Sequence, residues 1–285
     1  AIAYILIMQR SRKAMAKLLF PGFKSKALTF SYDDNTTQDR RLTKIFRKYG
    51  LAATFNINTG SFGSIGHLDN HGGFYCEYNR INESEAGELY RGFEVASHTV
   101  SHCLLPKAEY SFFESQVLDD CKKIGELCGT PAVGIAYPCG SYDTATLEHL
   151  RKLGIRYART IKDTHGFALP EDFLEWHPTC HDHDPLINRL TESFLNDDAD
   201  GLRLFYIWGH SFEFDKNDRD RWADMDLLCK TLSGREDIWY ATNREICDYI
   251  TAARSADGSL ENNSTDIDLY YETNGEKIIL KGNSR

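Results

Sequence analysis

Two adjacent carboxylates end an apolar stretch near the start of the chain. In LTFSYDDN, residues 28–35, an apolar and β-branched run is followed at once by Asp33 and Asp34. Neighbouring carboxylates repel each other, so a buried strand has little reason to end in two bare charges. A nearby cation would keep both ionised and would allow one carboxylate to bind it while the other acts as a base.

Two histidines follow a later strand-like segment. His98 and His102 lie four residues apart in SHTVSH. On one helical turn this spacing puts both imidazoles on one face, within reach of a single metal ion. With Asp34 they would form a set of two histidines and one carboxylate that leaves positions open for water and substrate. We therefore predict a divalent metal site, with zinc as the expected ion.

Two other histidine pairs are weaker candidates for a metal site. His181 and His183 flank Asp182, but the side chains of such a run converge only in a turn, and a polar loop near the cleft is the more ordinary interpretation. His67 and His71 have helical spacing, yet IGHLDNHGG is too rich in glycine for a firm helix. We therefore prefer the pair that follows a strand end.

Strand-like and helix-like segments alternate along most of the chain. Strands are predicted at 27–32, 53–57, 94–97, 133–136, 156–160, 202–208 and 238–240, and helices at 39–49, 82–91, 111–128, 143–153, 186–195, 220–232 and 242–253. Such alternation indicates an α/β fold with a parallel sheet and right-handed crossovers. The number of units favours a barrel, in which function gathers at the C-terminal ends of the strands.

The remaining segments flank or interrupt this pattern. Residues 1–26 are predicted to be an N-terminal extension and 27–254 the catalytic domain. Residues 58–80 lack periodicity and are predicted to be a long loop. The tail at 255–285 is polar, then weakly alternating, with Asn274-Gly275 as a hairpin signal, so it is predicted to be a short β appendage or part of a truncated second domain.

The composition is that of a globular protein with an acidic balance. The chain has 285 residues, 41% hydrophobic and 26% charged, and a formal net charge of −9. The absence of a long basic run argues against nucleic-acid or anionic-membrane partners. The apolar run at 1–8 is too short to span a bilayer.

The cysteines and the N-terminal sequence predict the cellular compartment of the protein. Eight cysteines without a CxxC pair are expected to be free and mostly buried thiols. The first basic residues follow the apolar run rather than precede it, the reverse of a signal peptide. We therefore expect a cytoplasmic protein, with a secreted or wall-associated protein as the alternative.

Four short motifs occur in order, each at a predicted strand end. They are TFSYDDN at 29–35, GFEVASHTVSH at 92–102, AYPCGSYD at 136–143 and LFYIWGHSFEF at 204–214. Together they resemble the polysaccharide deacetylases, metal-dependent carbohydrate esterases related to chitin and peptidoglycan deacetylases. The resemblance runs from about 27 to 253. It implies a distorted (β/α) barrel with seven strands.

The resemblance also implies roles for individual residues. The metal ligands would be Asp34, His98 and His102. Asp33 would be the general base that acts on metal-activated water, and His210 the general acid that protonates the departing amine or alkoxide. The backbone N–H of Cys139, which follows Pro138, would help to hold the oxyanion.

Several positions depart from the family's pattern. Asn35 stands where the family usually has glycine, and asparagine tolerates a left-handed backbone almost as well. The third motif lacks the arginine that often braces the base; Tyr137 precedes the proline, and Cys139 replaces an aromatic residue. The family's pair of Asp and Trp is not clear, and Trp176 is the nearest candidate.

Aromatic residues near the motifs are candidates for the sugar cleft. Tyr142 and Trp176 are predicted to stack against a pyranose face, with Pro138 also lining the cleft, although core packing would explain aromatic residues equally well. Trp208 and Phe212 are weaker candidates of the same kind.

The predicted function is metal-dependent removal of N- or O-linked acetyl groups from an oligo- or polysaccharide. One alternative keeps the fold and the metal but hydrolyses a non-peptide C–N bond in a small amide or cyclic imide; relatives of that kind often alter the first motif, which is intact here. Another is a carbohydrate-binding domain with a vestigial site. The intact ligands, base and acid favour the enzyme.

Overall fold

A parallel sheet built around one long strand forms the centre of the molecule. The computed structural model describes residues 16–70, 74–106, 108–216, 221–256 and 263–283. The central strand is β2 (Lys26–Asp33), and every residue in it is buried. An apolar, β-branched run of this kind is typical of a strand covered on both faces.

Seven parallel strands follow one another around the sheet. Their order is β8 (Tyr157–Arg159), β7 (Gly134–Ala136), β6 (Glu94–Ser97), β3 (Thr54–Ile57), β2, β10 (Arg203–His210) and β9 (Cys180–His181). A further strand, β11 (Ile238–Tyr240), pairs with the first residues of β2. The predicted distorted (β/α)7 barrel is confirmed.

One irregular segment closes the ring between β8 and β10. The Trp176 N–H donates to Ala158 O, and the Thr160 N–H donates to Trp176 O, each at 3.0 Å. A few residues later, β9 pairs with β10 in parallel. Residues 176–181 therefore bond to both edges of the sheet and join its two ends.

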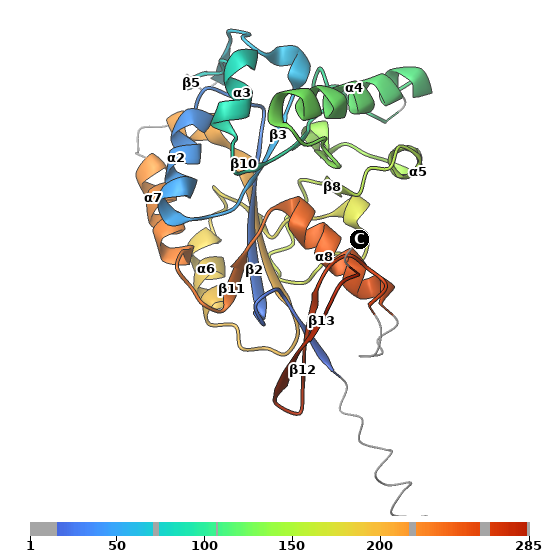
Figure 1. Ribbon diagram of the computed structural model, residues 1–285. Helices are drawn as coiled ribbons and strands as arrows, with labels where there is room; N and C mark the ends of the chain where they lie inside the picture. Colours follow the sequence, from blue (N-terminus) through green and yellow to red (C-terminus); the bar gives the residue numbers. More distant parts are fainter. Residues whose placement is uncertain (1–15, 71–73, 107, 217–220, 257–262, 284–285) are drawn as a thin grey trace, which may run out of the picture.

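Helices surround the strands, as the alternating pattern predicts. They are α2 (Asp39–Tyr49), α3 (Glu83–Leu89), α4 (Tyr110–Cys128), α5 (Thr144–Lys152), α6 (Ile187–Leu195), α7 (Arg221–Leu232) and α8 (Asn243–Ser255). Figure 1 shows α2, α6 and α7 on one side of β2 and α8 on the other. Capping boxes open α3 at Asn82 and α8 at Thr242, where the sequence places them.

Two hairpins stand outside the barrel. The predicted loop at 58–80 contains one, β4 (His67–Asn70) paired with β5 (Phe74–Glu77), so the prediction of a structureless loop is wrong there. The predicted tail hairpin is present: β12 (Leu269–Thr273) pairs with β13 (Glu276–Leu280). It also pairs with β1 (Lys17–Leu19), so residues just before and just after the barrel share one small sheet.

The sequence also predicts free thiols and an N-terminal apolar run too short to cross a membrane. All eight cysteines are free, and Cys139 is the exposed one. No helix in the described part of the chain has the length and apolar character needed to cross a bilayer.

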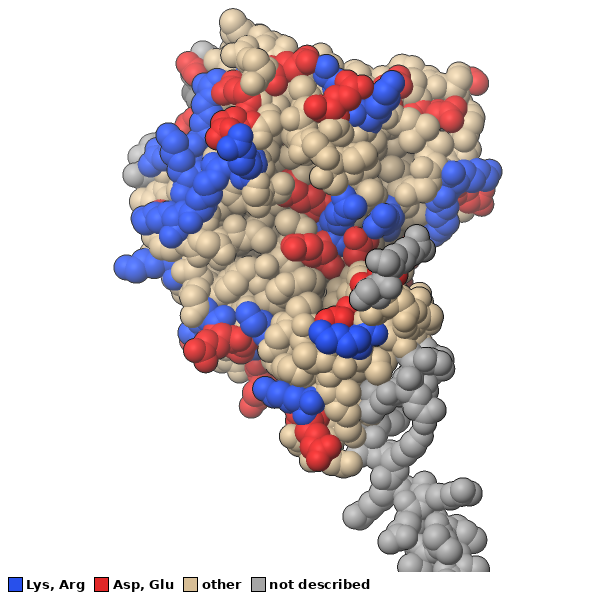
Figure 2. All heavy atoms as spheres, in the orientation of Figure 1, with Lys and Arg blue, Asp and Glu red and all other residues tan. Residues whose placement is uncertain are grey.

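The net negative charge is not spread evenly over the surface. Figure 2 shows Lys and Arg side chains gathered over α2. This helix contributes Arg40, Arg41, Lys44, Arg47 and Lys48. Arg40 pairs with Glu85 at 2.7 Å, and Arg47 donates to the carbonyl of Leu89 at 2.7 Å, so these cations fasten α2 to α3.

Candidate active site

Strand register brings the key polar residues side by side. Asp33, the last residue of β2, is level with His210 on β10 and with Asn56 on β3. His98 comes directly after β6, the neighbour of β3. The carboxyl ends of parallel strands meet at one end of a barrel. The site therefore forms there from segments that are far apart in the sequence.

Two histidines face one oxygen of Asp34. His98 Nε2 lies 3.8 Å and His102 Nε2 3.9 Å from Asp34 Oδ1. The Nδ1 of His98 lies 2.8 Å from the carbonyl of Ala136, which places the proton on Nδ1 and leaves the Nε2 lone pair free. Asp34 Oδ1 is buried and accepts no hydrogen bond. Three converging donor atoms, one of them a buried oxygen without a hydrogen bond, fit a divalent cation.

The two histidines converge through a turn, not through the predicted helical turn. Residues 98–102 are not helical, and Thr99 and His102 have positive φ values of 64° and 54°. The two imidazole rings nevertheless lie 4.7 Å apart, centroid to centroid. The spacing pointed to two rings that lie together in the structure, although the geometry that brings them together is different from the predicted one.

Left-handed backbone recurs in the loops of this site. Asp34 and Asn35 have φ values of 81° and 39°, and Cys139 has a φ of 54°. Asn35 is the residue that replaces the expected glycine, so its predicted tolerance of a left-handed backbone is confirmed. Conformations of this kind are costly for residues other than glycine and cluster at functional sites.

Residues from the segment after β5 hold Asp34 in place. Tyr78 donates its hydroxyl to Asp34 Oδ2 at 2.8 Å, and Arg80 Nη1 lies 3.4 Å from Oδ1. Arg80 also donates to the backbone carbonyl of Asp34. Burial acts to raise the pKa of Asp34, but the charges of His98, His210 and Arg80 lower it to about 2. The carboxylate is therefore ionised and ready to bind a cation.

Asp33 is held on both oxygens. Asn56 Nδ2 donates to Oδ1 at 2.8 Å, and Arg159 Nη2 donates to Oδ2. Burial acts to raise the pKa of Asp33, but the charge of Arg159, followed by those of His98 and His210, holds that pKa below its usual range. The brace that is missing from the third motif is thus supplied by Arg159 at the end of β8.

His210 lies between Asp33 and a second carboxylate. Its Nε2 is 3.9 Å from Asp33 Oδ2, and its Nδ1 is 3.2 Å from Glu213 Oε2. Burial acts to lower the pKa of His210, but its hydrogen bond to Glu213 and the charges of Asp33 and Asp34 raise the pKa overall. An imidazole in these surroundings holds its proton to a higher pH than a free histidine.

A family model identifies the matching part of the chain. The family described as polysaccharide deacetylase matches residues 21–158. This match covers just under half of the chain. The predicted resemblance to the polysaccharide deacetylases is therefore confirmed over residues 21–158. The matched range contains Asp33, Asp34, His98 and His102, and it ends one residue before Arg159.

One solved structure of a putative deacetylase shares the fold, and two further deacetylase structures are more distant matches. A putative polysaccharide deacetylase from Mycobacterium smegmatis has a TM-score of 0.57 and 16% identity over 85% of this chain and 95% of that chain. The Streptococcus pyogenes deacetylase PplD has a TM-score of 0.40 and 23% identity over 47% of this chain and 55% of that chain. The Bacillus subtilis peptidoglycan deacetylase PdaC has a TM-score of 0.46 and 19% identity over 81% of this chain and 95% of that chain. This chain covers about half of the length of the streptococcal protein, and no curated protein matches it in sequence.

The third deacetylase motif forms a tight turn beside the site. Pro138 and Cys139 lie in the short helix η2 (Pro138–Gly140), with Pro138 buried and Cys139 exposed. Tyr142 stacks on Tyr137 with ring centroids 5.0 Å apart and donates its hydroxyl to Glu175 at 3.0 Å. The proposed oxyanion role of the Cys139 N–H and the sugar contacts of Pro138 and Tyr142 remain predictions.

Trp176 does not fit the predicted role of a sugar platform. Its side chain is 1% exposed and packs edge-on against Phe173 and Tyr206 in the core, so neither face can meet a pyranose ring. Trp208 is also buried: its indole N–H donates to Asp163 at 2.8 Å, and its ring carries the Arg159 guanidinium at 4.6 Å. Both tryptophans therefore support the barrel from within.

Several residues of this site were missed from the sequence. Arg159 lies at the end of a predicted strand, where an arginine among apolar residues is a signal of a buried ion pair. Glu213 lies three residues after His210 in the same motif. Arg80 and Tyr78 fall in the segment without periodicity, so no pattern singled them out. Of the weaker pair, His67 lies in β4 and His71 is outside the described residues.

Proposed function

We propose that this protein is a metal-dependent hydrolase that removes N- or O-linked acetyl groups from an acetylated oligo- or polysaccharide. The supporting observation is the convergence, at one end of a deacetylase barrel, of an ionised carboxylate with a free oxygen, two histidines, a braced second carboxylate and a third histidine. These residues are Asp34, His98, His102, Asp33 and His210.

Asp34, His98 and His102 would hold the ion, for which we propose zinc. A zinc ion bound there would polarise the acetyl carbonyl and lower the pKa of the attacking water to about 7. Tyr78 and Arg80 hold Asp34 so that Oδ1 points towards both imidazoles. The Ala136 carbonyl fixes the tautomer of His98.

Asp33 is suited to take the proton from the water. Arg159 and Asn56 fix the orientation of its carboxylate and keep it ionised, so it can accept a proton without first losing one. It lies next to the metal ligands, with Oδ2 3.8 Å from His98 Nε2. Adjacent residues would thus divide two tasks: Asp34 would bind the ion and Asp33 would accept the proton.

His210 is suited to return a proton to the leaving group. Glu213 on Nδ1 favours the protonated imidazole, and Nε2 faces the space beside Asp33. An amine or alkoxide leaving group needs that proton before the C–N or C–O bond can break. Both kinds of acetyl linkage therefore suit the same residues.

The metal and the chemistry can be tested together. We expect Asp34→Asn and His98→Ala to lose both bound zinc and acetate release from acetylated chito-, xylo- or peptidoglycan fragments. Asp33→Asn should keep the metal and lose about 100- to 10,000-fold in turnover, because a general base contributes that range. Metal content is measured by elemental analysis and acetate by an enzyme-coupled assay.

Two results would contradict this function. One is full acetate release from a variant without metal at Asp34, His98 and His102. The other is hydrolysis of small cyclic amides with no activity on any acetylated saccharide, which would favour the alternative C–N hydrolase. Cys103→Ser, a change at a partly buried thiol outside the ligand set, provides a control for handling and folding.

A further inference from the structure

A second group of metal-binding side chains lies behind the general acid. His181, Asp182 and His183 follow one another at the end of β9, where residues 182–183 form a turn. The turn brings three donor atoms together. His181 Nδ1 lies 3.1 Å from Asp182 Oδ1, and His183 Nε2 lies 3.5 Å from the same oxygen. This cluster is separate from the oxygen of Asp34 that faces His98 and His102.

We propose that His181, Asp182 and His183 form a second site for a divalent transition metal such as zinc. In a tetrahedral zinc site with bonds of about 2.0 to 2.1 Å, neighbouring donor atoms lie about 3.3 Å apart. The two separations at Asp182 Oδ1 fall on either side of this value. Asp182 Oδ1 and His183 Nε2 are buried, and neither makes a hydrogen bond.

The surrounding residues orient the donors as the outer partners of metal ligands do. Tyr32 donates its hydroxyl to the other oxygen of Asp182 at 2.7 Å, which leaves Oδ1 free. The Nδ1 of His181 accepts the backbone N–H of His183 at 3.0 Å, so the ring proton lies on Nε2, 3.0 Å from Glu213 Oε2. A cation would take the Nδ1 lone pair in place of that amide. A histidine that gives one nitrogen to a metal and the other N–H to a carboxylate is a recurring arrangement.

The backbone of β10 is shaped to admit this carboxylate. Asp182 lies against Gly209, where an added Cβ would come within 2.5 Å of Oδ2. The Asp182 N–H donates to the carbonyl of Trp208 at 2.8 Å, and the His181 N–H donates to Asp163 at 3.2 Å. The turn that carries the three donors is therefore fastened to the barrel on its backbone.

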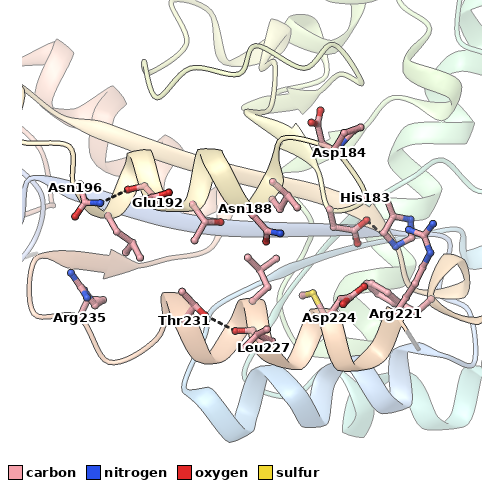
Figure 3. Close-up of a pocket in the computed structure, with 18 residues that line it drawn as sticks. His183, Asp184, Asn188, Glu192, Asn196, Arg221, Asp224, Leu227, Thr231 and Arg235 are labelled. Carbon is pink, nitrogen blue, oxygen red and sulfur yellow. Dashed lines mark hydrogen bonds and ion pairs between the residues drawn. The ribbon is translucent and has the colours of Figure 1, made fainter. Parts of the chain in front are cut away.

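A cavity reaches part of this cluster. A cavity of about 700 Å³ between α6 and α7 is lined at one end by Asp182 and His183. Figure 3 shows His183 and Arg221 at that end, with Asn188 and Glu192 of α6 facing Leu227 and Thr231 of α7. The charged residues of the lining are Asp182, Asp184, Glu192, Asp224, Arg221 and Arg235. Carboxylates outnumber guanidinium groups, which favours the entry of a cation.

A neighbouring cluster offers a matched comparison. Asp163, His165 and Asp184 also lie close together. Both oxygens of Asp163 accept N–H donors, from Trp208 and from the backbone of His181, and His165 pairs with Asp184 at 2.7 Å. Its donors are therefore satisfied by protein groups, and we expect it to bind no metal.

The second site can be tested by counting the metal ions that this chain binds. The wild type, dialysed against buffered free zinc, should hold two equivalents by elemental analysis. The Asp34→Asn variant and the His183→Ala variant should each hold one equivalent of zinc, and the double variant should hold none. The His165→Ala control should hold two equivalents. Cobalt added to Asp34→Asn should produce visible d–d absorption that disappears when His183→Ala is added to that variant.

The outcomes separate this proposal from the proposed function. If the wild type and His183→Ala both bind one equivalent of zinc, the second site is overturned and the first stays intact. If the wild type binds one equivalent of zinc, and His183→Ala loses it while Asp34→Asn keeps it, the second site is supported and the first is contradicted. Asp182→Asn, which keeps the shape of the side chain, repeats the test if His183→Ala fails to fold.

Discussion

Arg159 is the residue on which Asp33, the proposed general base, most depends. It is fully buried, donates to Asp33, and stacks on Trp208. Removing one partner of a buried ion pair leaves the other charge uncompensated, which costs about 3–5 kcal/mol. The ion pair stabilises the fold above the usual carboxyl pKa, and this contribution is lost as the pH falls through the lowered pKa of Asp33.

Arg159→Met should therefore lower the free energy of unfolding at neutral pH by about 3–5 kcal/mol, measured by urea unfolding. It should also raise the pKa of Asp33, so the acidic limb of the pH–rate profile moves to higher pH. Arg159→Lys should show smaller changes in both, because it keeps the charge but loses the planar fork. Arg203→Met, which breaks a pair with Asp197 near the surface, should cost less than about 1 kcal/mol. An unshifted acidic limb in Arg159→Met would contradict the bracing role.

At the scale of the elements, the first residue of α2 is a buried carboxyl with an unusually high pKa. Asp39 is buried; its Oδ2 accepts the Tyr90 hydroxyl at 2.7 Å, and its Oδ1 accepts no hydrogen bond. Burial raises the pKa of Asp39 from its usual 3.8 to about 7, although the nearby hydroxyls of Ser211 and Tyr90 act against this. A carboxyl with a raised pKa in the fold stabilises the protein when protonated, and that stability is lost as the pH rises towards the raised pKa.

We expect Asp39→Asn to weaken the fall in unfolding free energy between about pH 4 and 7. Since one pKa unit corresponds to about 1.4 kcal/mol, the effect should be of the order of a few kcal/mol. The measurement is a series of urea unfolding curves across this pH range. Asp143, an exposed residue that caps α5, serves as a control: its pKa is lowered by the Thr146 backbone N–H, so Asp143→Asn should not remove the same slope. Identical slopes for the wild type and Asp39→Asn would show that Asp39 is charged throughout.

At the scale of the whole molecule, the small terminal sheet is packed onto the barrel. Leu269 of β12 is fully buried and belongs to the same core cluster as Phe20 and Tyr249 of α8. Tyr249 donates its hydroxyl to the carbonyl of Leu19, at the end of β1. Residues on both sides of the predicted 27–254 domain therefore contribute to its core.

Leu269→Ala should destabilise the protein by about 2–5 kcal/mol, as truncation of a buried leucine does. Ile279→Ala on β13, at a side chain that is 40% exposed, should change stability by less than about 0.5 kcal/mol. Thermal and urea unfolding of the two variants would make the comparison. Equal, small effects would mean that the sheet is only loosely attached.

The arrangement of the site could be predicted because a parallel barrel gathers strand ends at one place. Asp33, Asp34, His98 and His210 each end or follow a periodic apolar segment, so their proximity required only the fold class. Arg159 required more: it meets Asp33 from a position 126 residues away, and such a contact depends on the register of strands that no local pattern encodes. Trp176 shows the converse, because a motif-like position does not reveal which way a side chain points.

One residue, Arg159, contacts both the segment that closes the ring and the proposed base, Asp33. Arg159 is the bridge partner of Trp176, in the segment that joins the two ends of the sheet. During refolding, strands β2, β3 and β6 could assemble Asp34, His98 and His102 from the first half of the chain. The counterion of Asp33 arrives only when the second half docks and completes the circle. Recovery of activity should therefore follow recovery of metal binding in time, so an incompletely folded chain would carry its ion without being an enzyme.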